Sequence, residues 1–180
     1  MKKVNKSASQ IIDNIILLEG EYVNHINDLG GPTKYGVTLE TARSHGYQGS
    51  IEALPKMTAK LIYMQKYWLL PGFNKINLLS QDLAIKLFDA GVNVGTSRCV
   101  SWLQRGLNLF TSHKLKIDGQ LGNKTLGALN DFLDKRAHMD GVSTLIKVIN
   151  VFQGAHYINI AEKKNSQRSF IYGWIRNRID

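Results

Sequence analysis

The chain has 180 residues, 43% of them hydrophobic, which suits one domain or a catalytic unit with a small appended lobe and excludes a disordered chain. Its 23 basic and 14 acidic residues give a net charge of +9, which favours an anionic partner: nucleic acid, a phospholipid surface or an anionic polymer such as a bacterial wall. The single cysteine, Cys99, excludes an intramolecular disulfide and any metal site built from several cysteines.

The first 18 residues contain lysines followed by an apolar stretch that Asp13 and Asn14 interrupt. We interpret this segment as a first helix and not as a secretory signal. No segment approaches the length of apolar sequence that crosses a bilayer, so we expect no membrane span.

The first predicted helix covers residues 8–18, where isoleucine and leucine recur at helical spacing. We expect Ser7 or Ser9 to cap its start, and we expect it to end at Glu19–Gly20 because glycine readily terminates a helix. Residues 24–36 are rich in Asn, Asp, Gly and Pro, which predicts a loop or a short β-hairpin.

Helices are also expected along the rest of the chain, and strands nearly absent. Thr38 and Thr58 are expected to cap two of these helices. In chain order, the remaining predicted helices cover residues 38–45, 59–70, 80–91, 96–110, 124–136, 142–163 and 167–178. The predicted fold class is therefore mainly α, with Gly91–Thr96 as the expected seam between two lobes.

The segment over residues 17–38, LLEGEYVNHINDLGGPTKYGVT, combines residue types that suit glycosidase chemistry. A carboxyl group such as Glu19, at a helix end where the chain turns, can face a groove and donate a proton to a leaving oxygen. A second polar group, here Asp28 with the hydroxyl of Thr33, can activate water or stabilise positive charge on the sugar. Simpler alternatives are a solvated acid for Glu19, a turn residue for Asp28 and a helix cap for Thr38.

The whole segment resembles the signature of glycoside hydrolase family 108, the N-acetylmuramidases of phage endolysins and bacteria. The matching positions are Glu19, Gly20, Tyr22, Val23, Asp28, Gly30, Gly31, Thr33, Tyr35, Gly36 and Thr38. The chain departs from the signature at Glu21, where glycine is usual, and conservatively at Val37. In size and two-part layout it also resembles the toxin-secretion type of muramidase within this family.

The resemblance implies a peptidoglycan hydrolase that cleaves the β-1,4 bond between N-acetylmuramic acid and N-acetylglucosamine. It implies a lysozyme-like helical catalytic lobe with a short β-hairpin, packed against a small helical C-terminal lobe. Glu19 is the implied essential acid, with Asp28 and Thr33 as the other catalytic candidates; no metal or cofactor is implied. The candidate substrate-binding residues are Tyr22, His25, Tyr35, Thr38, Asp89, Asn93 and Trp102. Core packing is the alternative for both tyrosines and for Trp102, and pairing within the fold is the alternative for Asp89.

Residues 102–129 resemble the peptidoglycan-binding module that commonly follows this family's catalytic region. The matching residues are Leu103, Gln104, Leu107, Asn108, Asp118, Gly119, Gly122 and Thr125. We predict a muramidase catalytic domain over residues 1–92 and a helical peptidoglycan-binding domain over 93–180. Peptidoglycan glycan strands, and stem peptides, are the expected partners; nucleic acid is not.

Two other functions fit parts of the sequence. The charge and the helix–turn–helix-like unit at 96–134 suit nucleic-acid binding, but the helix from Lys124 presents few basic side chains. The change at Glu21 suits a wall-binding protein without activity. We expect synthesis in the bacterial cytoplasm without a signal peptide and action at the cell wall or periplasm, after holin-type release or dedicated secretion.

Overall fold

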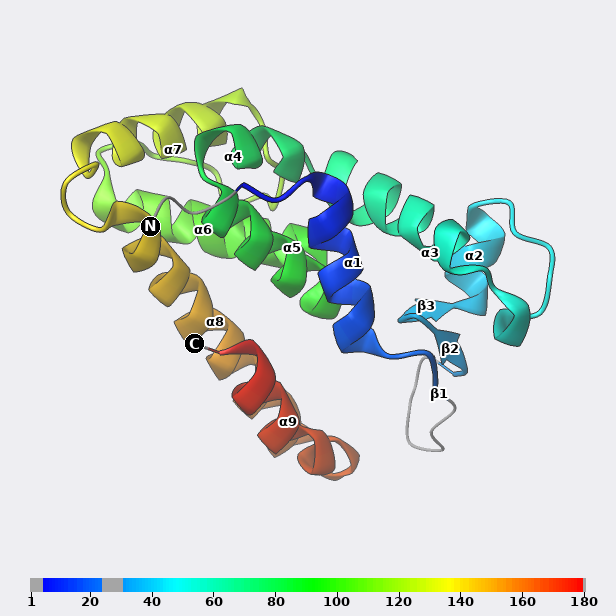
Figure 1. The fold of residues 1–180 in the computed structure, drawn as a ribbon. Coiled ribbons are helices and arrows are strands. Elements are labelled where there is room, and N and C mark those ends of the chain that lie inside the picture. The colour runs from blue at the N-terminus through cyan, green and yellow to red at the C-terminus, as the bar shows by residue number, and fades with distance from the viewer. Residues whose placement is uncertain (1–4, 24–30, 180) are drawn as a thin grey trace. The chain divides into compact units, whose positions relative to one another are not determined.

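The computed structural model describes residues 5–23 and 31–179. The chain forms two compact units, Met1–Leu70 and Pro71–Asp180. The prediction of a mainly α-helical fold is confirmed: helices dominate the described residues, and the strands found there form one small sheet in the first unit (Figure 1).

The first unit combines one long helix, a three-stranded antiparallel sheet and shorter helical segments. In chain order these are α1 (Ala8–Glu19), β1 (Tyr22–Val23), β2 (Thr33–Lys34), β3 (Val37–Thr38), α2 (Leu39–Ser44), the 3-10 turn η1 (Ile51–Ala53), α3 (Lys56–Ile62) and the π-helix η2 (Tyr63–Leu69). The strand order β1-β2-β3 follows the sequence. Residues 24–36 were expected to form a loop or a short β-hairpin, and the described part of this segment, residues 31–36, contains β2 and the turn that leads into β3.

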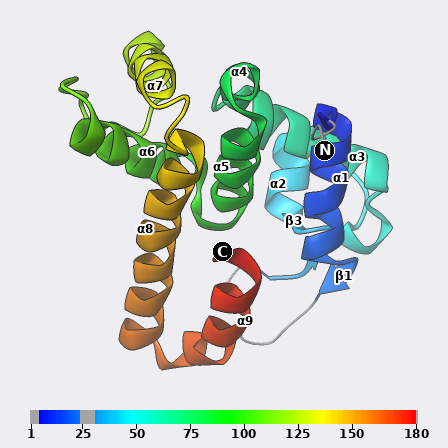
Figure 2. The same ribbon diagram turned by 60° about the vertical axis from the view of Figure 1, so that its left-hand side comes forward.

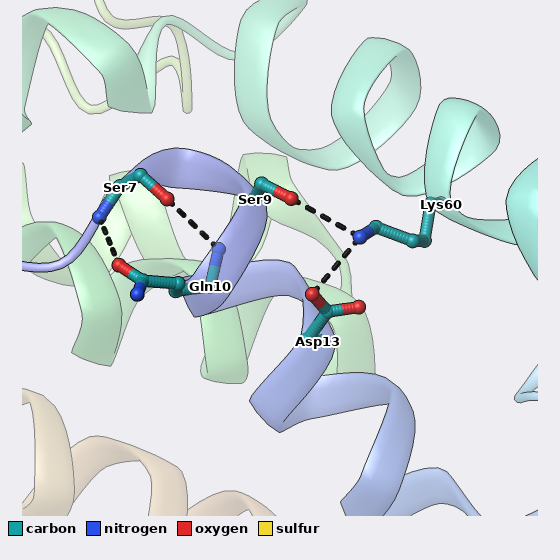
Figure 3. Close-up of polar contacts among 5 residues, drawn as sticks. All are labelled: Ser7, Ser9, Gln10, Asp13 and Lys60. Atoms are coloured by element: carbon teal, nitrogen blue, oxygen red, sulfur yellow. Dashed lines mark hydrogen bonds and ion pairs between the residues drawn. The ribbon is translucent and has the colours of Figure 1, made fainter.

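Helix α1 begins with a complete capping box. The Ser7 hydroxyl accepts a hydrogen bond from the Gln10 amide at 3.2 Å, and the Gln10 side chain accepts one from the Ser7 amide at 2.8 Å (Figure 3). These bonds satisfy two amides that the first helical turn otherwise leaves without partners. The helix ends where Gly20 adopts a φ of 80°, so the predicted start at Ser7 and end at Glu19–Gly20 are confirmed.

One face of α1 carries the core of the first unit. Four isoleucines on it are buried, namely Ile11, Ile12, Ile15 and Ile16, and the helix contacts α3 and η2. Burying a side chain of this size stabilises a fold by about 1.5–3 kcal/mol. At the edge of this contact the Lys60 ammonium donates to the Ser9 hydroxyl at 3.1 Å and to the Asp13 carboxylate at 2.9 Å (Figure 3).

The helix that follows η1 differs from its prediction in two ways. It begins at Lys56 after Pro55, so Thr58 lies within the first turn and the predicted cap at Thr58 is wrong. Proline fixes its own backbone and lacks an amide donor, which suits it to the start of a helix. From Tyr63 the helix widens into the π form, in which the Leu70 amide donates to the Gln65 carbonyl at 3.0 Å.

The second unit is helical throughout its described part. It contains α4 (Phe73–Leu79), α5 (Gln81–Val94), α6 (Thr96–Phe110), α7 (Asn123–Lys135), α8 (Gly141–Lys163), the 3-10 turn η3 (Asn165–Gln167) and α9 (Arg168–Arg178). Helix α5 contacts α4, α6 and α8, and α9 doubles back beside α8 (Figure 2). The shared core includes Leu83, Leu87, Phe88, Leu103, Leu107, Leu145 and Ile149.

Two features of this unit were not predicted. Helix α4 has no counterpart among the predicted helices. The residues Gly91–Val94, expected to begin a seam, instead form the last turn of α5, which ends at Gly95 with a φ of 94°. A Cβ atom at Gly91 would lie 3.1 Å from the Thr96 side chain, 3.2 Å from that of Phe73 and 3.5 Å from Cys99 Sγ, so glycine suits this closely packed turn of the helix.

The capping box of α1 gives the first prediction. Replacing Ser7 by alanine removes the side-chain acceptor for the Gln10 amide, and we expect the free energy of unfolding to fall by about 1 kcal/mol. Urea denaturation followed by circular dichroism measures this change. Ser112→Ala is the control, because Ser112 lies outside the helices. An equal loss in both variants would contradict a specific role for the cap.

Candidate active site

Glu19 occupies the last position of α1 and is half-buried. A negative charge at a helix C-terminus opposes the helix macrodipole, and the last turn of α1 carries no basic residue. Helix stability therefore does not account for an acid at this place. Gly20, with its positive φ, turns the chain immediately after the carboxyl group.

Tyr35 and Gly36 form the two-residue turn between β2 and β3. Their φ angles are 54° and 70°, and both are positive as a type I′ hairpin turn requires. Glycine adopts this conformation freely, whereas a tyrosine there is strained and must be held by its surroundings. Two backbone bonds hold it: the Tyr35 amide donates to the Glu21 carbonyl at 2.6 Å, and the Tyr35 carbonyl accepts from the Tyr63 hydroxyl at 3.0 Å.

Gly36 brings this turn against the candidate acid. A Cβ atom at Gly36 would lie 2.5 Å from the Tyr63 hydroxyl and 3.0 Å from both Cβ and Cγ of Glu19. The turn, the stem of the carboxyl side chain and the tyrosine hydroxyl thus meet at one point. Glycine at position 36 is required by both the backbone angle and the lack of space.

Tyr63 is a member of this group that the sequence did not reveal. Its ring is 1% exposed and its hydroxyl fixes the turn that lies against Glu19. In the sequence it is one apolar position of a helix, which is indistinguishable from ordinary core. Its place as the first residue of the π-helix η2 is the distinguishing feature, and such segments are frequent at functional sites.

The two candidate threonines are neighbours in the sheet. Thr33 pairs directly with Thr38 across β2 and β3, so their side chains share one face. The Thr38 hydroxyl caps α2, accepting from the Thr41 amide at 3.2 Å and donating to the Thr41 hydroxyl at 3.1 Å. The predicted capping by Thr38 is confirmed. Thr33 is half-buried on the central strand.

The candidate tyrosine on β1 is exposed. Tyr22 is 41% exposed, and its hydroxyl donates to the Glu52 carboxylate at 3.2 Å. Hydrogen bonds, first from its own backbone amide and then from Ser50, lower the pKa of Glu52 below its ordinary value. Glu52 is therefore a charged acceptor that orients the Tyr22 ring. The other candidates of this segment, His25 and Asp28, lie outside the described residues.

The departure from the family signature at Glu21 is explained by the backbone. Gly20 adopts a positive φ, whereas Glu21 is not among the described residues with a positive φ. Any side chain is tolerated at such a position, so Glu21 introduces no strain into the turn that follows Glu19.

The candidates in the second unit are engaged within that unit. Asp89, whose side chain is 15% exposed, forms an ion pair with Arg178 of α9. Asn93 accepts a hydrogen bond from the Tyr157 hydroxyl at 2.6 Å. Trp102 is 6% exposed, and its ring stacks on Phe152 with 6.4 Å between centroids. Their substrate-binding roles stay predictions, and these contacts favour the structural alternatives.

The motif residues of the second half hold a loop. The Gln104 amide nitrogen donates to the Asp118 carboxylate at 2.9 Å and to the Gln120 carbonyl at 3.0 Å, while its oxygen accepts from the Gly119 amide at 3.0 Å. Asn108 exchanges two bonds with the backbone of Leu115, at 2.9 and 2.8 Å. These α6 side chains therefore replace regular secondary structure as partners for the segment before α7.

The described residues contain no group of three or more His, Cys, Asp or Glu side chains placed to hold a metal ion. Over the same part of the chain, no helix combines the length and apolar character needed to cross a bilayer.

Comparisons with known proteins define the class. Residues 12–95 match the model of the glycosyl hydrolase 108 family, and residues 98–179 match that of a predicted peptidoglycan domain. The solved structure of SagA from Brucella abortus is similar with a TM-score of 0.65 and 24% sequence identity, over 91% of this chain and 90% of that one. Comparison with curated proteins gives no match.

The protein thus pairs a domain of a glycoside hydrolase family with a predicted peptidoglycan domain, a combination that implies hydrolysis of peptidoglycan. More particularly, it consists of a glycosyl hydrolase 108 domain followed by a predicted peptidoglycan domain, on the fold that it shares with SagA. The family resemblance and the fold class inferred from the sequence are confirmed.

The boundary between the family domains does not coincide with the boundary between the compact units. The family models meet between residues 95 and 98, whereas the compact units divide after Leu70. Helices α4 and α5 match the first family by sequence and pack within the second unit. The predicted division into 1–92 and 93–180 stays a prediction.

The contact at Gly36 gives a prediction about stability. Gly36→Ala is expected to destabilise the fold by about 1–2 kcal/mol through its positive φ and by about 1–3 kcal/mol more through overpacking against Tyr63 and Glu19. Gly31→Ala is the matched control, because Gly31 has the same φ of 70° and nothing within 4 Å of its Cβ position.

Denaturant unfolding of the two variants measures the difference. Adding Tyr63→Phe to Gly36→Ala removes the nearest atom, so part of the loss should be recovered, with a coupling of about 0.5–3 kcal/mol. Equal losses in the Gly31 and Gly36 variants would show that the contact with Tyr63 and Glu19 contributes nothing.

Asp118 gives a prediction about pH. The hydrogen bond from Gln104, followed by that from the Gln120 amide, lowers the pKa of Asp118 below its ordinary value. A lowered pKa contributes stability above the ordinary carboxyl range, and this is lost as the pH falls through the lowered pKa. We expect Asp118→Asn to unfold at a lower temperature than the wild type at neutral pH and at the same temperature in strong acid. A melting difference that is independent of pH would contradict this.

Proposed function

We propose that the protein is an N-acetylmuramidase that cleaves the β-1,4 bond between N-acetylmuramic acid and N-acetylglucosamine, with Glu19 as the proton donor. The observation that carries the proposal is the half-buried carboxyl at the end of α1, its stem against the Gly36 turn, in the segment that matches glycosyl hydrolase 108. An acid placed against helix electrostatics, with a turn fixed beside it, suits a catalytic role better than a stabilising one.

In the proposed mechanism Glu19 protonates the glycosidic oxygen as the bond to the sugar breaks. This relieves the leaving group of negative charge, and positive charge develops on the sugar ring. Asp28 then activates a water molecule or stabilises that charge, and the Thr33 hydroxyl positions the water. The separation of the two carboxyl groups decides the stereochemical outcome: about 5 Å for retention and about 6.5–9.5 Å for inversion.

Tyr22 and Tyr35 are proposed to line the groove for the glycan strand. Their aromatic faces suit packing against pyranose rings, and Tyr22 is already oriented through its bond to Glu52. His25 would contact substrate from the same segment of sequence. For Thr38, the capping bond to Thr41 occupies the hydroxyl, so any contact with the sugar would come from its methyl group.

The proposed place of action is the cell wall or periplasm, reached by holin-type release or dedicated secretion. The predicted peptidoglycan domain supports retention on the wall, with glycan strands and stem peptides as its ligands. The net charge of +9 supports accumulation on an anionic polymer, since long-range attraction raises the local concentration.

Mutation of the proposed acid tests the reaction. We expect Glu19→Gln to lower hydrolysis of purified sacculi by at least about 10²-fold, because a general acid contributes about 10²–10⁴-fold. The melting temperature should stay unchanged or rise slightly, because the change removes an unfavourable charge at a helix C-terminus. Glu21→Gln is the matched control and should retain most of the rate, since Glu21 is an exposed carboxylate two residues further on.

The same digests identify the bond. After reduction of the fragments, mass spectrometry should find muramitol at their ends if the muramic acid linkage is cut. Reduced glucosamine ends would instead place the cut at the other glycosidic bond, and intact glycan strands with cut peptides would refute glycosidase activity. Binding of the wild type to sacculi without release of fragments would favour the wall-binding alternative.

A further inference from the structure

Helix α8 presents a stripe of side chains that its own fold leaves uncovered. Val151 is 70% exposed and Ile158 is 50% exposed, and Ala155 between them is also exposed. Lys147 precedes these residues and Glu162 follows them, both exposed. At 3.6 residues per turn the five positions fall within an arc of about 80° and extend over about 22 Å of helix. They are called the α8 stripe below.

The rest of α8 faces its own unit. The buried positions are Gly141, Leu145, Ile149, Asn150, Gln153, Gly154, Tyr157 and Ala161, and the helix contacts α5, α6, α7 and α9. The stripe is therefore the side of α8 opposite a complete set of neighbours. A helix that is apolar on both its packed and its exposed sides indicates a further partner.

The order of residues in the stripe has an internal symmetry. The two ends carry opposite charges, Lys147 and Glu162, and the next positions inward carry β-branched apolar residues, Val151 and Ile158. Both pairs have the same midpoint, between Gly154 and Ala155. Neither Lys147 nor Glu162 has a hydrogen-bond or ion-pair partner in the described residues. An antiparallel copy of the same helix, related by a two-fold axis through this centre, would complement it at every position.

We propose that the α8 stripe is a self-association surface that pairs with the same stripe of a second copy of this chain. In this dimer Lys147 meets the partner's Glu162, Val151 packs on the partner's Ile158, and Ala155 lies beside the axis. The arrangement is isologous, so both charge pairs form at once. The small side chain of Ala155 beside the axis allows the two helices to approach closely, and a crossing angle of about 20° keeps both ends of the stripe in contact with the partner helix.

The pairing is weak in solution and gains strength on the substrate. A single helix pair buries less than the roughly 1,200 Å² of a standard interface, so we expect dissociation in dilute solution. On peptidoglycan, many chains bound to one polymer raise the effective concentration, and a dimer would hold the wall through two peptidoglycan domains. This gain rests on the proposed function, whereas the pairing itself does not.

Charge reversal tests the pairing. Sedimentation of the full chain at increasing concentration and physiological ionic strength should show a reversible monomer–dimer equilibrium. Lys147→Glu and Glu162→Lys should each weaken association at least about tenfold, because like charges then face each other across the axis. The double variant Lys147→Glu with Glu162→Lys should restore it. Lys163→Glu is the control for net charge, since the exposed Lys163 lies off the stripe and should not weaken association.

A disulfide trap tests the axis independently of affinity. Oxidised Ala155→Cys should form covalent dimers, and Ser143→Cys, exposed near the start of α8, should not. The native thiol stays out of this reaction, because burial raises the pKa of Cys99 to about 12. A wild type that stays monomeric at every concentration, single reversals that associate normally, or a double variant that fails to recover would each overturn the proposal.

Discussion

The close approach of Gly36 to Glu19 and Tyr63 is the constraint on which the candidate active site depends. A helix end, a hairpin turn and a π-helix, drawn from three stretches of sequence, converge where no side-chain atom can be added. The turn keeps a tyrosine at a φ of 54° because two hydrogen bonds fix it. Strain of this kind persists only where the surroundings over-determine it, which is typical of sites that must hold a geometry.

Local chemistry accounts for what the sequence predicted well. Helix α1 is marked at both ends by residues with one dominant role, Ser7 as a cap and Gly20 as a terminator. The hydroxyl of Thr38 starts α2 in the same way. Helix α6 was predicted at its observed bounds because its apolar residues repeat at helical spacing between two breaks.

The missed features depend on contacts between distant residues. The start of α3 is set by Pro55 and not by Thr58, although both residues are compatible with a helix start. In the sequence Gly91 suggests a break, whereas in the fold it lies inside α5 and allows Phe73, Thr96 and Cys99 to pack closely on the helix. Tyr63 is recognisable as part of the site only when its hydroxyl is seen on the Tyr35 carbonyl, 28 positions earlier.

The candidate site residues also divide into those indicated by the local motif and those whose role depends on distant contacts. Glu19, Thr33, Tyr35 and Thr38 were grouped from the motif, and in the fold they occupy one helix end and the sheet beside it. Asp89, Asn93 and Trp102 lie outside that motif, and each is engaged by Arg178, Tyr157 or Phe152 in the second unit. Residue type indicates which chemistry is possible, whereas only the fold indicates whether the side chain is already used.

The clasp between α5 and α9 has a consequence for the order of folding. Arg178 reaches Asp89 across 89 positions, and its carbonyl accepts from Lys86 at 2.7 Å. A contact of such high sequence separation has to close a long loop, which is entropically costly until the intervening helices have docked. We therefore expect the contact between α5 and α9 to close late in folding, and interactions made after the transition state chiefly slow unfolding. The clasp would then prolong the lifetime of the folded second unit more than it speeds its formation.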